Sequence, residues 1–291
     1  LSLQRIALGT VQFGLSYGIA NRQGQPYLNE VAKILAVARQ SGMDTLDTAI
    51  AYGDSEQRLG AIGVQDWQVV SKLPALSELS TSVTKWTKGS VISSLERLKI
   101  DSLYGILLHQ PDDLMSPQGE EVYNALLSLK KEQLVQKIGI SVYHPAQLDA
   151  LCSRFSFDLV QAPLNVLDQQ LIHSGWLAKL TTQNIEVHVR SIFLQGLLLM
   201  DEQTRPKKFR RWSHLWKTWH NWLQQNNLTP LQACLGFALA QPQISHVLVG
   251  VDSVDQLKEI LTFADSLKTP IPNLLSTTDL DLINPSRWQT L

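Results

Sequence analysis

The sequence of 291 residues contains few cysteines and no long apolar segment. Its two cysteines, Cys152 and Cys234, lie far apart in apolar patterns, which is typical of free thiols in a reducing compartment. The longest apolar run, residues 192–200, is too short to span a bilayer, and the first residues do not resemble an export signal. We therefore expect a cytoplasmic protein without a membrane anchor.

The sequence also lacks an excess of charge of either sign. It has 25 basic and 26 acidic residues, so its formal net charge is −1. Such a balance gives no field that would attract a phosphate backbone or an anionic membrane, and we expect no nucleic-acid or membrane partner. With 44% hydrophobic residues, the chain can nevertheless bury a large core.

Two kinds of functional motif are missing as well. No GxGxxG sequence is present, which argues against a Rossmann dehydrogenase. The seven histidines include no HxH pair at the end of a predicted strand, and no carboxylate cluster has metal-ligand spacing. We expect no metal site, and a metal-dependent barrel hydrolase is disfavoured.

Short strand-like runs alternate with amphipathic helical runs along the whole chain. This alternation is typical of a parallel sheet covered by helices, and the length suits a barrel of eight such units. The fold class predicted for residues 1–291 is α/β, a single-domain (β/α)₈ TIM barrel. Its strands are expected at residues 5–10, 43–48, 67–72, 103–109, 135–142, 157–161, 185–190 and 246–250.

Helix boundaries are marked by capping residues. Asn29 is expected to cap the first long helix and Gly42 to end it. Thr229, which precedes a proline, opens a later helix, and Ser253 with Gln256 has the spacing of a capping box.

One segment interrupts the repeat, a Trp-rich insertion at residues 194–228 after the seventh strand. Trp212, Trp216, Trp219 and Trp222 fall on one helical face of it. Two interpretations stay open: an amphipathic helix packed on the barrel, or a lid that supplies part of a substrate pocket. The tail after Thr269 is expected to be loop-like.

Four polar residues stand at or just after the ends of predicted strands, where barrels of this kind build their sites. They are Asp47, Tyr52, Lys72 and His109. Taken singly, each has a purely structural explanation, such as a helix cap or a packed ring. Lys72 is less ordinary, because a buried ammonium needs a partner, and Asp47 on the neighbouring strand supplies one.

The motifs around these residues resemble those of aldo-keto reductases. LGTVQFG, DTAIAYG, VVSKLP, LLHQP, IGIS and LVQAPLN occur in the order of that family and cover most of the chain. The resemblance implies an NAD(P)-dependent oxidoreductase that reduces an aldehyde, ketone or sugar carbonyl, or runs the reverse reaction. Tyr52 would donate the proton, Lys72 would assist it, Asp47 would orient Lys72, and His109 would bind the carbonyl oxygen.

The resemblance also implies a set of cofactor contacts. Ser141 and Gln161 would bind the carboxamide, although Val142 stands where the family commonly has Asn. Arg190 replaces an aromatic residue that stacks on the nicotinamide, so its role stays open between stacking, an acidic substrate and a cofactor phosphate. The other expected contacts are Gly9, Thr10 and Val11 at the first strand, Ser191, Phe193, Gln195 and Gly196 along the pyrophosphate, and Gly250, Ser253 and Gln256 at the adenosine end.

The adenosine end departs furthest from the family. Gly250 and Gln256 occupy positions where a basic residue often meets the 2′-phosphate of NADP, while Ser253 opens a helix whose N-terminus favours anions. These residues favour NAD or dual use over strict NADP. A second functional class, a nicotinamide-binding regulator or scaffold subunit without activity, is disfavoured by the intact set of four catalytic residues.

Overall fold

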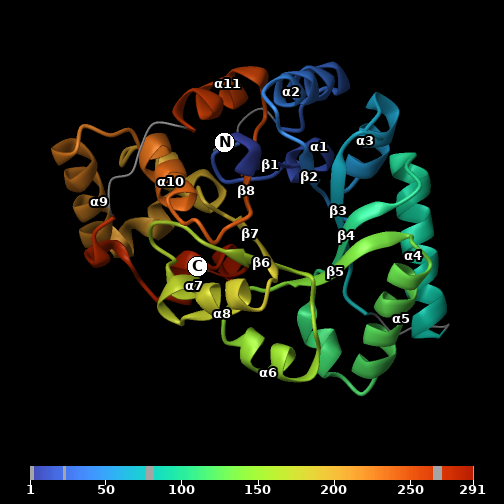
Figure 1. Cartoon of the computed structure of the whole chain (residues 1–291). Coiled ribbons are helices and arrows are strands. Elements are labelled where there is room, and N and C mark those ends of the chain that lie inside the picture. Colours follow the sequence, from blue (N-terminus) through green and yellow to red (C-terminus); the bar gives the residue numbers. More distant parts are fainter. Residues whose placement is uncertain (1–2, 22–23, 77–81, 265–270, 291) are drawn as a thin grey trace.

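Eight parallel strands close into a barrel in which each strand pairs with its neighbours in sequence and β8 pairs with β1 (Figure 1). The computed structural model describes residues 3–21, 24–76, 82–264 and 271–290. The predicted (β/α)₈ fold is confirmed. The strands are β1 (Ile6–Gly9), β2 (Thr45–Asp47), β3 (Gln68–Leu73), β4 (Leu103–Leu108), β5 (Val135–Ser141), β6 (Leu159–Pro163), β7 (Glu186–Arg190) and β8 (His246–Gly250).

Helices surround the barrel and connect its strands (Figure 1). No helix in the described part of the chain is long and apolar enough to cross a membrane. The α-helices are α1 (Val11–Gly14), α2 (Leu28–Gln40), α3 (Ser55–Ile62), α4 (Val83–Leu98), α5 (Gly119–Lys131), α6 (Gln147–Arg154), α7 (Gln170–His173), α8 (Trp176–Thr182), α9 (Ser213–Gln225), α10 (Pro230–Leu239), α11 (Val254–Phe263) and α12 (Leu280–Ile283). The 3₁₀ turns are η1 (Leu3–Arg5), η2 (Pro111–Met115), η3 (Leu194–Leu199), η4 (Lys207–Trp212), η5 (Asn273–Leu275) and η6 (Pro285–Thr290).

The helix-boundary predictions are confirmed at Thr229 and at Gly42, which follows the end of α2 with a φ of 85°; they are confirmed in part at Ser253 and wrong at Asn29. Thr229 caps α10 through a complete capping box with Gln232, and the Ser253 hydroxyl accepts the Gln256 N–H at the start of α11. Helix α2 instead begins after Tyr27, so Asn29 lies inside its first turn. Extended backbone at Tyr27 stops the helix there without any side-chain cap.

The barrel has two hydrophobic clusters. The larger one lies between the sheet and the helices and includes most of the buried residues. The smaller one joins Val70 of β3, Leu107 of β4 and Leu159 of β6, which are not all neighbouring strands. These three side chains therefore fill the barrel interior, as is usual for this fold.

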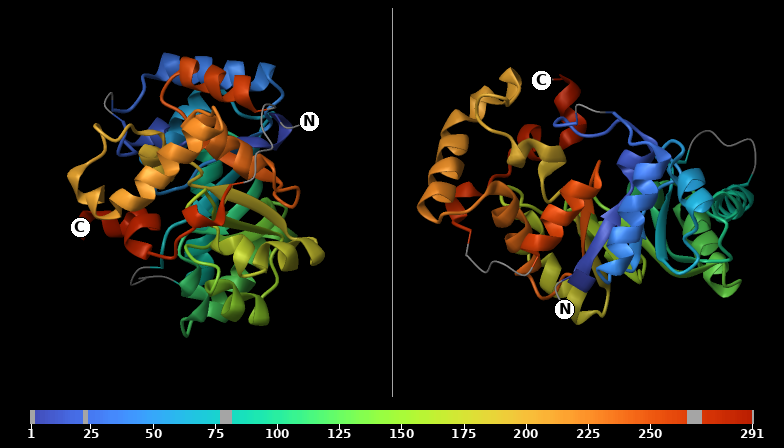
Figure 2. Two further views of the ribbon diagram at one scale, coloured as in Figure 1. Left: turned by 90° about the vertical axis from the view of Figure 1, so that its left-hand side faces the viewer. Right: turned by 90° about the horizontal axis from the view of Figure 1, so that it is seen from above.

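The Trp-rich insertion forms the predicted helix, α9, and packs its aromatic face inward. Trp216 and Trp219 are buried, and their indole N–H groups donate to the carbonyl oxygens of Phe209 and Leu198 at 2.9 and 3.4 Å. Helix α9 also contacts η5 from the C-terminal tail, and Figure 2 shows the two segments side by side.

The prediction of a loop-like tail was wrong over the residues that the structure describes. The start of that tail, at Thr269, lies outside the described residues, but from Asn273 onward the chain forms η5, α12 and η6. Buried Trp288 holds this end in place, since its ring packs 4.9 Å from that of Phe209 and its N–H donates to Leu282 O. Aromatic packing on the insertion thus orders the tail.

Candidate active site

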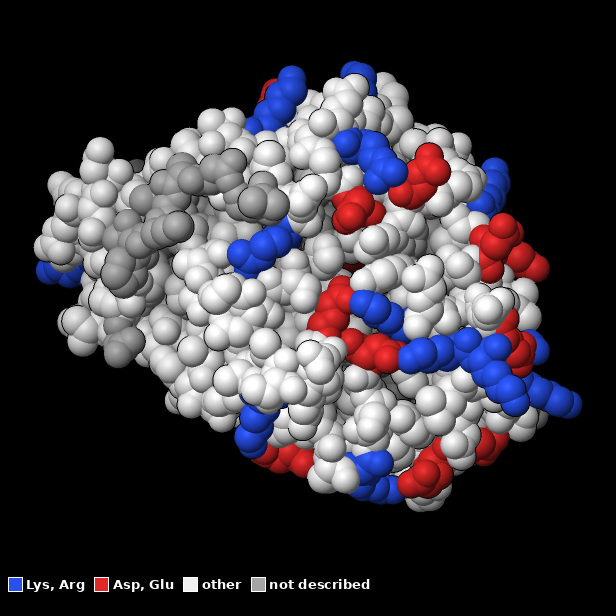
Figure 3. Space-filling model, in the orientation of Figure 1, with Lys and Arg blue, Asp and Glu red and all other residues white. Residues whose placement is uncertain are grey.

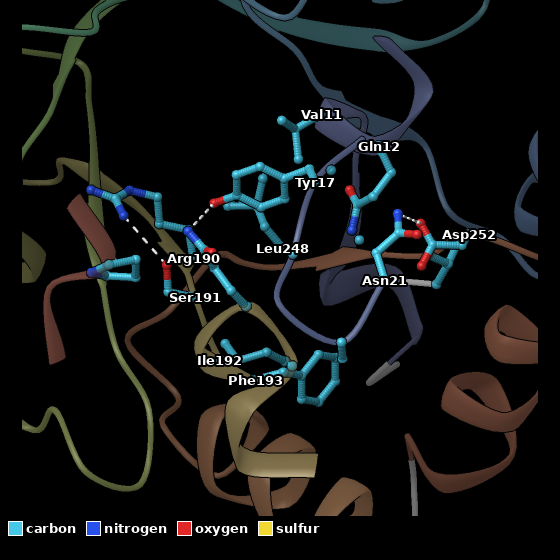
Figure 4. Close-up of a pocket in the computed structure, with 18 of the residues that line it drawn as sticks. Val11, Gln12, Tyr17, Asn21, Arg190, Ser191, Ile192, Phe193, Leu248 and Asp252 are labelled. Carbon is cyan, nitrogen blue, oxygen red and sulfur yellow. Dashed lines mark hydrogen bonds between the residues drawn. The ribbon is translucent and has the colours of Figure 1, made fainter. Parts of the chain in front are cut away.

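A cleft of about 880 Å³ opens at the carboxyl ends of the strands (Figure 4). Its size lies within the range of small-molecule binding sites. Asp47, Tyr52 and His109 line it, as do eleven of the thirteen residues expected at the cofactor. Those eleven are Gly9, Thr10, Val11, Gln161, Arg190, Ser191, Phe193, Gln195, Gly196, Gly250 and Gln256.

A buried ion pair lies beneath the cleft. Lys72 Nζ donates to Asp47 Oδ1 at 2.6 Å and to the carbonyl oxygen of Thr48 at 2.9 Å. The Lys72 and Asp47 side chains are 1% and 7% exposed, so solvent screens their attraction little. Burial alone would lower the pKa of Lys72, but the Asp47 carboxylate and Tyr52 raise it above its ordinary value. Lys72 is therefore held charged.

Tyr52 connects this pair to the cleft. Its hydroxyl oxygen lies 3.5 Å from Lys72 Nζ, and its ring packs edge-on against His109 with centroids 5.8 Å apart. Burial, with the positive charges of Lys72 and Arg190, lowers the pKa of His109 to about 4. His109 is consequently neutral near pH 7 and retains one N–H as a donor.

Gln161 links the ion pair to the neighbouring strands. Its amide nitrogen donates to Asp47 Oδ2 at 2.7 Å, and its amide oxygen accepts the Ser141 hydroxyl at 3.2 Å. Ser141 is buried and is not among the residues that line the cleft. Its hydroxyl contacts the described cleft through Gln161, and its expected contact with a carboxamide stays a prediction.

The loop after β7 has a strained backbone. Ser191, Leu194 and Gln195 have φ angles of 62°, 49° and 53°, and Gly196 follows at 91°. Bonds within the loop hold this turn, since the N–H groups of Leu194 and Gly196 donate to the carbonyl oxygens of Ser191 and Phe193 at 2.9 and 3.0 Å. Gly196 is required here for two reasons, its positive φ and the 2.7 Å that would separate an added Cβ from the Cβ of Ala20.

The far end of the cleft, next to α11, is acidic. Asp252, Gln256 and Glu259 line it together with Gly250 and Ile260. The Gln12 side chain packs against Gly250, where an added Cβ would lie 2.3 Å from Gln12 Nε2. Ser253 is not among the described lining residues and its hydroxyl caps α11, so its expected cofactor contact stays a prediction.

Several lining residues had no signal in the sequence. Tyr17 and Asn21 come from the segment after β1, where the Tyr17 hydroxyl accepts from Gln195 Nε2 at 2.9 Å (Figure 4). Tyr143 follows β5. The C-terminal tail contributes Asn284, Pro285, Ser286 and Gln289. Only the docking of the tail, through Trp288, brings this last group to the cleft.

Helix α9 does not contribute to the described lining. The insertion reaches the cleft through η3, at Gln195, Gly196 and Leu199, whereas none of the lining residues belongs to Ser213–Gln225. The packing interpretation is confirmed for Trp216 and Trp219, which are buried, and a role of the tryptophans in a substrate lid stays a prediction.

A second polar cluster spans the beginnings of β7 and β8, at the opposite end of the barrel. Oxygen and nitrogen atoms of Glu186, His188 and His246 that could bind a metal lie within 4.8 Å of one another. Because these residues come from two paired strands, the sequence motifs of a single strand did not predict the cluster. Glu186 is already bonded to Lys137, to Tyr104 at 2.9 Å and to His188 at 2.6 Å. On the face of the molecule drawn in Figure 3, acidic and basic side chains lie next to one another. The cluster is accounted for as a charge network.

Comparisons with known proteins agree with this architecture. Residues 5–270 match the sequence model of the Aldo/keto reductase family. The chain is 24% identical over 260 residues to "Uncharacterized oxidoreductase YqkF" of Bacillus subtilis (strain 168), covering 82% of this chain and 83% of that protein. It is 32% identical over 119 residues to "Oxidoreductase YdhF" of Escherichia coli (strain K12), covering 40% of this chain and 39% of that protein.

Solved structures show the same fold. The putative aldo-keto reductase PA4992 of Pseudomonas aeruginosa superposes with a TM-score of 0.66 at 24% identity, covering 89% of each chain. Aldo-keto reductase AKR11C1 of Bacillus halodurans, in its holo form, superposes with a TM-score of 0.72 at 20% identity, covering 91% of this chain and 88% of that one.

Proposed function

The chain belongs to the aldo/keto reductase family, and we propose that it interconverts an aldehyde, ketone or sugar carbonyl and the corresponding alcohol with a nicotinamide cofactor. The observation that carries the proposal is the charged Lys72 beneath the Tyr52 hydroxyl, beside a neutral His109, at the wall of an open cleft. A barrel that only bound the cofactor would not need a buried ammonium at this place.

Reduction needs a proton donor next to the carbonyl oxygen. The bound cofactor would supply the hydride, which leaves negative charge on that oxygen. Tyr52 would donate its proton there, and the Lys72 charge 3.5 Å from its hydroxyl would stabilise the tyrosinate that remains. Asp47 holds Lys72 through the 2.6 Å bond, while Gln161 fixes the other carboxylate oxygen.

His109 would orient the substrate. With its pKa lowered to about 4, the ring is a neutral hydrogen-bond donor over the whole neutral range. Its ring packs edge-on against that of Tyr52 with centroids 5.8 Å apart, and both residues line the cleft. A carbonyl oxygen in that region would accept from both residues.

The rest of the cleft fits a dinucleotide. It extends from Tyr52 to α11, and Gly196 lines it where an added Cβ would lie 2.7 Å from the Cβ of Ala20. The pyrophosphate would lie along the residues after β7, where Ser191, Phe193, Gln195 and Gly196 line the cleft. Asp252 and Glu259 near Gln256 would repel a 2′-phosphate, which supports NADH binding at least as tightly as NADPH.

An assay of carbonyl reduction tests the proposed function. Oxidation of NADH and NADPH is followed by absorbance with a panel of aldehydes, ketones and sugars, with the Tyr52→Phe variant as the matched control. Reduction by the unaltered chain, strongly reduced in the variant, is expected. Tight cofactor binding without turnover of any carbonyl would instead favour a non-enzymatic regulator.

A further inference from the structure

Arg190 extends its guanidinium from β7 toward the side of the cleft where β5 ends. Its Nη2 donates to the carbonyl oxygen of Val142 at 2.9 Å, and its Cζ lies 5.0 Å from the centroid of the Tyr143 ring. Both residues follow β5, and β6 lies between β5 and β7 in the barrel. The side chain therefore crosses over β6, and its direction is fixed at two points.

The guanidinium retains unused hydrogen-bonding capacity. Of its five N–H groups, one donates to Val142 and one makes a long 3.4 Å bond to the Ser191 hydroxyl. No carboxylate among the described residues lies within 4.0 Å of it, and no other Lys or Arg is among the described residues that line the cleft. The charge of Arg190 acts to lower the pKa of buried Asp168, but the Asp168 carboxylate accepts its hydrogen bonds from Gln170. A guanidinium with free N–H groups and no carboxylate partner can bind an anion.

Its location places it near the reacting groups rather than near the adenosine end. Arg190, Tyr52 and His109 line the same cleft, and the charge of Arg190 contributes to the lowered pKa of His109. Gln256 and Asp252, at the adenosine end, stand on the β8 side, and Figure 4 shows Arg190 and Asp252 on opposite sides of Tyr17. The structure thus disfavours contact between Arg190 and a 2′-phosphate.

We propose that Arg190 forms an anion subsite for the substrate, so that the preferred carbonyl compounds carry a carboxylate or a phosphate group. This inference rests on the proposed carbonyl reduction. The planar fork of Arg190 can make two parallel hydrogen bonds to either group, and the Tyr143 ring with Val142 O holds the fork in place. The subsite would bind the substrate away from its reacting carbon and leave Tyr52 and His109 to the carbonyl oxygen.

Matched pairs of substrates test the subsite and distinguish the two anions. Succinic semialdehyde is compared with butanal for carboxylate, and glyceraldehyde 3-phosphate with glyceraldehyde for phosphate. The charged member of at least one pair should have a kcat/KM higher by about tenfold to a hundredfold, the usual worth of hydrogen bonds to a charged group. In Arg190→Gln this ratio should fall to about one, mainly through KM, while Arg190→Lys should keep part of it. Arg154→Gln, an exposed arginine outside the cleft, is the control.

A binding measurement separates the subsite from catalysis. Succinate and inorganic phosphate are titrated calorimetrically into the cofactor-loaded chain, without turnover, and one of them should bind at least tenfold more weakly to Arg190→Gln. If anion binding depends on Arg190 but no carbonyl compound is reduced, the proposed function is wrong and the proposed anion subsite is supported. If neutral carbonyls are reduced as well as charged ones, the subsite is wrong. If Arg190→Gln lowers the affinity for the cofactor but leaves the kcat/KM ratio of charged to neutral substrate unchanged, the subsite is also wrong. That result would indicate that Arg190 stacks on the nicotinamide.

Discussion

Lys72 donates a 2.6 Å hydrogen bond to Asp47 although both side chains are almost fully buried. A buried ion pair of this kind adds little net stability, because desolvation offsets much of the attraction, but removing one partner leaves an uncompensated charge. The pair is thus costly to break and serves to keep a charged amine 3.5 Å from the Tyr52 hydroxyl.

We expect Lys72→Met to lower the free energy of unfolding by about 3–5 kcal/mol, because the buried Asp47 carboxylate loses its cation. Urea denaturation measures it. Lys33→Met, at an exposed lysine of α2, is the control and should change stability by less than about 0.5 kcal/mol. Equal, small effects of the two substitutions would show that Asp47 is not held by Lys72.

His109 gives a pH dependence with a definite sign. Its pKa is about 4 in the folded chain, where burial comes first among the causes, and about 6.5 when unfolded. The unfolded state therefore takes up a proton first as the pH falls, so stability is lost between about pH 6.5 and 4. His109→Asn should flatten that part of the stability curve, measured by urea denaturation at several pH values. An unchanged slope would mean that His109 titrates normally.

The acidic far end of the cleft predicts the cofactor preference. In a fluorescence titration NADH should bind at least as tightly as NADPH, and Asp252→Asn should strengthen NADPH binding by a few-fold because a charge facing the 2′-phosphate is removed. Asp201→Asn, outside the cleft, should change neither. NADPH binding tenfold tighter than NADH, a difference of about 1.4 kcal/mol, would contradict the prediction.

The burial of Trp219 predicts that the insertion has a structural role. It is 0% exposed and packs inward on α9, so Trp219→Ala should cost about 3–5 kcal/mol of unfolding free energy. The KM for substrate should stay within about twofold at a temperature where the variant is folded. A large rise in KM with little loss of stability would support the lid interpretation.

Much of the fold and of the reacting centre was predictable because both depend on local pattern. The strands alternate with helices in sequence, and Asp47, Lys72 and His109 stand at or beside strand ends, so the barrel itself brings them together. Tyr52 follows β2 closely enough to share that position.

The remainder depends on contacts between distant segments. Ser141 donates to Gln161 from the neighbouring strand, a side-chain contact that sequence spacing does not reveal. The tail reaches the cleft only because Trp288 packs against Phe209, and short 3₁₀ turns carry little periodicity to predict. The direction of Arg190 likewise depends on Val142 and Tyr143 from another strand.

The most direct test of the account is the kinetics of Tyr52→Phe with a carbonyl substrate and the preferred cofactor. Removing the hydroxyl leaves the ring packing on His109 and the Lys72–Asp47 pair in place, so the fold and the cofactor Kd should be unchanged within about twofold. Turnover should fall by roughly 10²–10⁴, the usual contribution of a positioned general acid. Turnover within a few-fold of the unaltered chain would contradict the assignment of Tyr52 as proton donor.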